Sequence, residues 1–137
     1  MSPKGQTLCL LLTVACPWLP CEAIEYVEFL KRHLDYPKST FGNDNAYCEA
    51  MMHDRGMLCW QSNTFVHASE YEVQSLCSSR GHLVAELERS SIPFPITVCS
   101  RRGKKPQGAC SYEGKSLTKE IWVTCLKGLP VYFNKYG

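Results

Sequence analysis

Apolar positions recur with helical spacing in three stretches of the chain. In the first stretch, the recurring apolar residues are Ile24, Val27, Leu30 and Leu34. Charged residues occupy the positions between them, which predicts an amphipathic helix over 24–34. Similar patterns predict short helices over 46–55, followed directly by Gly56, and over 70–77.

Alternation of apolar and polar residues replaces helical spacing in much of the remaining chain. Residues 63–67 alternate in this way and are rich in β-forming residues, which predicts a strand. Glycine and proline residues separate the further predicted strands, which lie over 96–99, 109–112, 121–125 and 131–136. Helices early in the chain and antiparallel strands later indicate the α+β class.

The first residues have the pattern of a secretory signal peptide. A short apolar run over 10–15 precedes Cys21-Glu22-Ala23, which offers small residues at the two positions that a signal peptidase reads. We therefore predict a signal peptide over 1–23 and a single globular domain over 24–137. The run is too short to cross a bilayer, which needs about 20 apolar residues, and we expect no membrane span. A buried first helix is the alternative, but two prolines after the run would break it.

Cysteine is unusually frequent, with nine in 137 residues. Cleavage after Ala23 would leave six: Cys48, Cys59, Cys77, Cys99, Cys110 and Cys125. An even number in a secreted domain predicts disulfides and an extracellular location, although the spacing does not choose among the possible pairings. The chain has no C-x-x-C pair, so we expect neither a metal site nor a cofactor.

Charge is balanced along most of the chain, with a formal net charge of +2. One cluster of cations departs from this balance: Arg101, Arg102, Lys104 and Lys105. Two interpretations of this cluster stay open, a solvated hairpin tip or a binding site for polyanions. The polyanions considered are RNA, heparin-like glycans and anions of the microbial envelope.

Four stretches of the chain carry a family resemblance. They are FLKRHLD at 29–35, YCEAMM at 47–52, CWQSNTFVH at 59–67 and GLPVYF at 128–133. Together they resemble the pancreatic ribonuclease superfamily, specifically its angiogenin-like branch with six cysteines. The resemblance implies a ribonuclease A-like fold, with three short helices, a curved antiparallel sheet and three disulfides. The implied pairs are Cys48–Cys99, Cys59–Cys110 and Cys77–Cys125.

The resemblance also implies where a catalytic centre would lie. Members of this family cleave RNA by transphosphorylation, with two histidines that move protons and a lysine that stabilises the phosphorane. His33 matches the first histidine, whereas Trp60 stands at the lysine position and Tyr132 at the second histidine. An indole carries no charge, and a phenol with a pKa near 10 is a poor acid at neutral pH. We therefore expect an inactive or very weak enzyme.

The same resemblance places four residues on the substrate-binding surface: Arg32, Asn63, Thr64 and Phe133. Arg32 stands where the family has a glutamine. Thr64 could read a pyrimidine edge or simply serve the strand. Arg32 could bind phosphate or lie in solvent at the helix end. Trp60 could stack on a base or fill the space that the lysine leaves.

These observations predict a secreted, monomeric binding protein of the ribonuclease fold. Its expected ligands are RNA, other polyanions, a cell-surface receptor or a microbial surface in host defence. A weak endoribonuclease that cleaves after pyrimidines is the first alternative. A reproductive-tract secretory protein is the second and rests on analogy alone.

Overall fold

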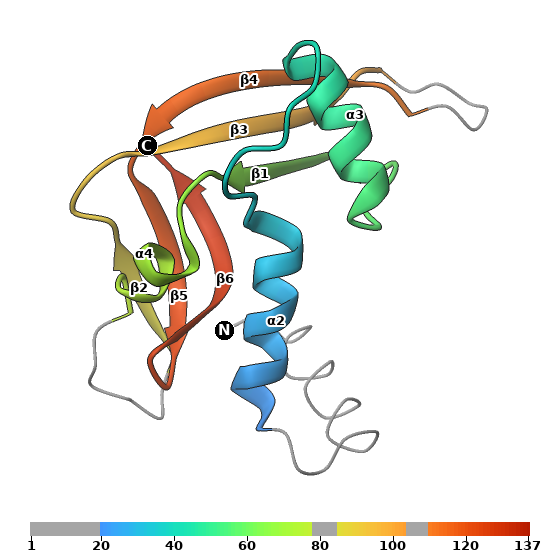
Figure 1. The fold of residues 1–137 in the computed structure, drawn as a ribbon. Coiled ribbons are helices and arrows are strands. Elements are labelled where there is room, and N and C mark those ends of the chain that lie inside the picture. The colour runs from blue at the N-terminus through green and yellow to red at the C-terminus, as the bar shows by residue number, and fades with distance from the viewer. Residues whose placement is uncertain (1–19, 78–84, 104–109) are drawn as a thin grey trace. The chain divides into compact units, whose positions relative to one another are not determined.

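The computed structural model describes residues 20–77, 85–103 and 110–137. Within these ranges the chain divides into two compact units (Figure 1). The first unit contains the described residues up to Leu30, together with Glu70–Ser91 and Glu120–Gly137. The second unit contains Lys31–Ser69 and Ile92–Lys119.

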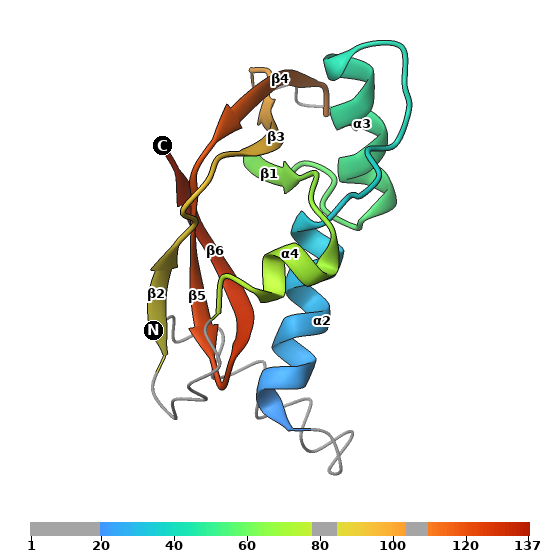
Figure 2. The same cartoon turned by 60° about the vertical axis from the view of Figure 1, so that its left-hand side comes forward.

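The first unit is built around a three-stranded antiparallel sheet in the order β2-β5-β6 (Figure 2). Its strands are β2 (Glu86–Arg89), β5 (Ile121–Leu126) and β6 (Leu129–Tyr136). Alternate residues of β5 are buried, and Val123 lies among them with no exposed surface. This alternation gives the sheet one core face and one outer face.

Two helices contribute to the first unit. Helix α2 (Cys21–His33) belongs to it as far as Leu30, and α4 (Glu70–Gln74) is a short helix. The Tyr26 hydroxyl donates to the Glu70 carboxylate at 2.6 Å and accepts a hydrogen bond from Gln74 at 2.8 Å. Tyr26 therefore links α2 to α4 while its ring is buried.

The second unit pairs one helix with a second antiparallel sheet in the order β1-β3-β4 (Figure 1). Its elements are α3 (Asp44–Asp54), β1 (Ser62–Val66), β3 (Phe94–Arg101) and β4 (Tyr112–Lys119). The Asn43 side chain accepts a hydrogen bond from the Ala46 backbone N–H and caps α3. The core of this unit includes Tyr47, Met52, Phe65 and Tyr112.

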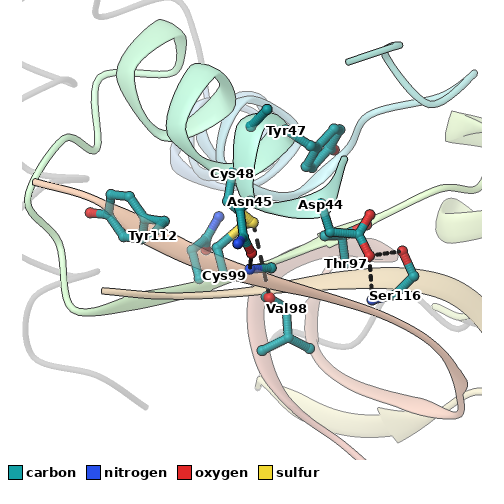
Figure 3. Close-up of a disulfide and its surroundings, with 12 residues drawn as sticks. Asp44, Asn45, Tyr47, Cys48, Thr97, Val98, Cys99, Tyr112 and Ser116 are labelled. Carbon is teal, nitrogen blue, oxygen red and sulfur yellow. Dashed lines mark hydrogen bonds between the residues drawn. A yellow bond between two sulfur atoms is a disulfide. The ribbon is translucent and has the colours of Figure 1, made fainter. Parts of the chain in front are cut away.

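Helix α3 lies directly on β3 and β4, as Figure 3 shows. The Asp44 carboxylate accepts hydrogen bonds from the Ser116 backbone N–H at 3.1 Å and hydroxyl at 2.8 Å. A Cβ atom at Gly114 would collide with the Asp44 carbonyl, so glycine permits this close approach. The first turn of α3 is thereby fastened to the edge strand.

Three disulfides have both cysteines among the described residues, and they join Cys48 to Cys99, Cys59 to Cys110 and Cys77 to Cys125. These are the pairs that the resemblance implies. The first two lie within the second unit and the third within the first. Each unit is therefore cross-linked internally.

The α+β class is confirmed, with three helices and two antiparallel sheets in the part of the chain that the structure describes. The prediction of a strand over 109–112 is wrong in its bounds, because β4 runs over Tyr112–Lys119. This strand is polar and lies at the sheet edge, where pairing with β3 holds it. Strand β2 was missed, since three of its four residues are charged. No helix in the described ranges is both long and apolar enough to cross a membrane.

Candidate functional site

His33 is the last residue of α2, and its ring is fixed by β1. The Nδ1 atom lies 2.9 Å from the Thr64 backbone carbonyl oxygen. Because a carbonyl can only accept, Nδ1 carries the hydrogen and Nε2 is the basic nitrogen of the neutral ring. Burial lowers the pKa of His33 from 6.5 to about 4; the Arg32 charge adds to this, while the hydrogen bond to Thr64 opposes it.

The end of α2 is held by side chains that bind its last carbonyl groups. Asn63 donates to the Arg32 carbonyl at 2.8 Å. Arg55 donates to the carbonyls of Lys31 at 2.7 Å and Leu34 at 2.9 Å. Carbonyls at a helix C-terminus lack intrahelical partners, so these contacts satisfy them. Asn63, predicted as a substrate contact, therefore has a structural role beside His33.

The backbone around Trp60 is held at several points. Cys59 has a φ of 70°, an unusual value for a residue with a side chain, and its sulfur is bonded to Cys110. Arg101 donates to the Cys59 carbonyl at 2.8 Å, and the Tyr112 hydroxyl donates to the Trp60 carbonyl. The Trp60 side chain, in contrast, is exposed, with 44% of the residue's surface accessible.

Arg32 and Trp60 form a stacked pair. The Arg32 guanidinium carbon lies 5.2 Å from the centre of the Trp60 ring, within the range of a cation–π interaction. Neither sequence-based interpretation of Arg32 or Trp60 anticipated this pairing. The pair combines an exposed aromatic ring with the positive charge of the residue that directly precedes His33 in the chain.

The remaining predicted residues are distributed between the two units. Thr64 is buried in the second unit, with 7% of its surface exposed. In the first unit, Tyr132 is half exposed and pairs with Thr124, whereas Phe133 is partly buried and pairs with Val123.

The cationic cluster is only partly within the described residues. Arg101 is the last residue of β3, is partly buried, and binds the Cys59 carbonyl. Arg102 is exposed. Lys104 and Lys105 lie outside the described residues. Arg101 thus supports the Trp60 segment and does not sit at a hairpin tip.

Comparison with known proteins shows which family the chain belongs to. The family model described as pancreatic ribonuclease matches residues 24–134. The chain belongs to the pancreatic ribonuclease family. A ribonuclease of Chelydra serpentina is 38% identical over 114 residues, covering 80% of this chain and 96% of that relative. Angiogenin of Mus musculus is 34% identical over 128 residues, covering 90% of this chain and 86% of the relative.

A solved structure of this family also has the same fold. The crystal structure of green turtle egg white ribonuclease superposes with a TM-score of 0.74 at 35% sequence identity. It covers 82% of this chain and 98% of the turtle chain. The ribonuclease A-like fold is therefore established for this member of the pancreatic ribonuclease family.

Two other histidines of this pancreatic ribonuclease family member have contacts away from His33. The buried His67 ring bonds the Asp35 carbonyl through Nδ1 at 2.8 Å and the Thr97 hydroxyl through Nε2 at 2.7 Å. His53 is exposed and pairs with the neighbouring Asp54 at 3.2 Å. Both nitrogens of His67 are thus used inside the fold, which suits a structural role.

Proposed function

We propose that this chain is a secreted member of the ribonuclease family that binds single-stranded RNA or other polyanions and has little or no ribonuclease activity. The observation that carries the proposal is the pair formed by Arg32 and Trp60. An exposed indole beside a guanidinium can stack on a base and attract phosphate. It cannot replace the mobile ammonium charge that the resemblance expects at this position.

Weak catalysis follows from the chemistry at three positions. His33, with a pKa lowered to about 4, is neutral at pH 7 but is a weak proton acceptor. Trp60 supplies no charge for the phosphorane, and Tyr132 is a phenol in place of an acid with a pKa near neutrality. Loss of a general acid typically costs about 10²–10⁴-fold, and loss of a charge stabiliser about 10²–10³-fold.

Binding is supported by the rigidity of the Trp60 segment. A disulfide and hydrogen bonds from two side chains fix its backbone, while the indole is exposed. A preorganised aromatic side chain loses little conformational freedom on binding. Stacking of one base on such a ring contributes about 1–3 kcal/mol.

The proposed secretion, monomeric state and further partners rest on the cysteine content and on the family. Signal cleavage after Ala23, secretion and a monomeric state agree with the cysteine content and with three internal disulfides. Similarity to angiogenins favours the angiogenin-like branch, with a cell-surface receptor or a microbial surface in host defence as further partners. Arg102 and its neighbours Lys104 and Lys105 would add positive charge for such surfaces.

One experiment separates binding from catalysis. Refolded protein is incubated with a pyrimidine-containing dinucleotide, and its affinity for a uridine oligomer is measured by fluorescence anisotropy. We expect binding without measurable turnover, and weaker binding for Trp60→Ala. Turnover within about tenfold of an intact family member, abolished by His33→Ala, would instead support the alternative of a pyrimidine-preferring endoribonuclease.

A further inference from the structure

The outer face of the β2-β5-β6 sheet carries a second aromatic residue paired with cations. The strand register aligns Arg89 of β2, Trp122 of β5 and Lys135 of β6 in one row across the sheet. The Arg89 guanidinium carbon lies 5.8 Å from the Trp122 ring centre, and the Lys135 ammonium nitrogen lies 4.8 Å from it. Figure 2 shows β5 between the other two strands.

The two cations belong to the two strands that flank β5, Arg89 to β2 and Lys135 to β6. The distances to the ring centre place the two charges no more than about 11 Å apart. Trp122 therefore works as a spacer that limits the conformations of two long side chains. Holding them in place before a ligand arrives lowers the entropic cost of binding.

Among the described residues, one acidic side chain, that of Glu120, contacts this row. The Glu120 carboxylate lies 3.6 Å from Arg89 Nε, and the Arg89 side chain is 60% exposed. Glu86 and Glu88 pair with Cys125 and Val123, whose side chains are buried, and so lie on the other face. The row therefore presents two cations whose charge is only partly offset.

We propose that Arg89, Trp122 and Lys135 form a binding site for a sulfated glycosaminoglycan. The inference deepens the proposed polyanion binding by assigning one ligand class to a second site. Trp122 already has a cation within cation–π range from each neighbouring strand, so a nucleobase that stacked on the ring would compete with these cations. A sulfated glycan needs fixed cations for anionic groups spaced along a flexible chain, and this row supplies them.

The test uses the full mature chain and heparin as the probe. Arg89→Gln combined with Lys135→Gln is compared with Lys115→Gln combined with Lys119→Gln, which removes the same charge from β4 of the other unit. We expect the first pair to weaken heparin binding about tenfold and to reduce the slope of log affinity against log salt by roughly 1.4 to 1.8. We expect the control pair to change both much less.

A second variant tests the spacer role of the indole. Trp122→Leu keeps both charges, so we expect an affinity loss of about threefold with a nearly unchanged salt slope. Circular dichroism and thermal unfolding check that each variant folds. Equal losses of heparin affinity in the Arg89→Gln, Lys135→Gln variant and in the Lys115→Gln, Lys119→Gln control would overturn the proposal.

The ligand class and the proposed function are tested separately. A uridine oligomer should bind the Arg89→Gln, Lys135→Gln variant almost as well as it binds the wild type, and Trp60→Ala should weaken that binding. If the Arg89→Gln, Lys135→Gln variant loses as much affinity for the uridine oligomer as for heparin, the assignment to a sulfated glycan is wrong. If Trp60→Ala leaves oligomer binding unchanged, the proposed function fails while the heparin result still stands.

Discussion

Two tryptophans, one in each unit, are paired with cations but are held by different means. Trp60 follows a residue with positive φ in an irregular segment, and a disulfide and side-chain hydrogen bonds fix its backbone. Trp122 lies in the middle strand of a three-stranded sheet, just before a shift in the register of β5 with β6, and its pairing with Arg89 and Lys135 brings the two cations into place. The same interaction therefore depends on a cross-link in one unit and on strand pairing in the other.

This difference also separates the chemistry of the two sites. Trp60 is paired with one guanidinium, that of Arg32, which directly precedes His33 in the chain, so it suits an RNA strand. Trp122 is flanked by two cations on an open sheet face, so it suits a ligand recognised by charge.

The largest expected effect concerns the residues at the catalytic positions. We expect wild-type turnover of a pyrimidine-containing dinucleotide to lie at least about 10⁴-fold below that of an intact relative. Trp60→Lys combined with Tyr132→His should raise this turnover by about 10²–10⁴-fold. Both changes restore the groups that the resemblance expects. Trp122→Lys serves as the control and should leave turnover unchanged. No gain in the double variant would mean that the low pKa of His33 alone limits catalysis.

The next effect tests the dependence of the Trp60 segment on its cross-link. Cys59→Ala combined with Cys110→Ala should lower the free energy of unfolding by about 2–4 kcal/mol, because the disulfide closes a long loop in the unfolded chain. The sequence separation is 51 residues. Urea unfolding measures the loss. In a Trp122→Phe background, acrylamide should quench the fluorescence of Trp60 more strongly once the disulfide is removed. Unchanged quenching would show that the hydrogen bonds from Arg101 and Tyr112 suffice to hold the segment.

A third effect is the pH dependence of the second unit. Burial lowers the pKa of His33 to about 4 and also lowers that of His67. The unfolded chain therefore binds protons at higher pH than the folded chain. The stability present above pH 6.5 should fall as the pH drops toward 4, by on the order of 3 kcal/mol for His33 at most.

Asp35 extends this dependence to lower pH. Burial would raise its pKa, but hydrogen bonds from Tyr47 and Ser39 lower it below the ordinary value. Its contribution is present above the unfolded value of 3.8 and is lost as the pH falls below it. Urea unfolding between pH 7 and 3.5 measures the curve. His33→Gln should flatten the part between pH 6.5 and 4, and an unchanged curve would exclude His33 as its source.

The sequence predicts regular elements well where apolar spacing is strong. The helices and the apolar strand β5 were found with small errors at their ends, because buried side chains recur at fixed intervals. Strands β2 and β4 were missed or misplaced because their residues are mostly polar and pairing with neighbouring strands fixes them.

Site residues show the same limit. His33, Trp60 and Thr64 could be singled out because they lie in motifs that resemble a known family. The contact of Arg32 with Trp60 and the structural role of Asn63 depend on how α2 ends against β1, which no short motif encodes. Trp122 was not singled out, since its alignment with Arg89 and Lys135 follows from the register of three strands.

The smallest expected effect compares the two cation–π pairs directly. Double-mutant cycles of Arg32→Ala with Trp60→Ala, and of Lys135→Ala with Trp122→Ala, give the coupling energy of each pair from urea unfolding. We expect about 0.5–1 kcal/mol for each, as is typical of exposed cation–π pairs. Trp122→Ala alone should cost more than Trp60→Ala, because Trp122 couples to two cations and packs in a sheet. A coupling near zero for Arg32 and Trp60 would mean that backbone contacts alone hold the indole, and the two sites would then differ in origin as well as in ligand.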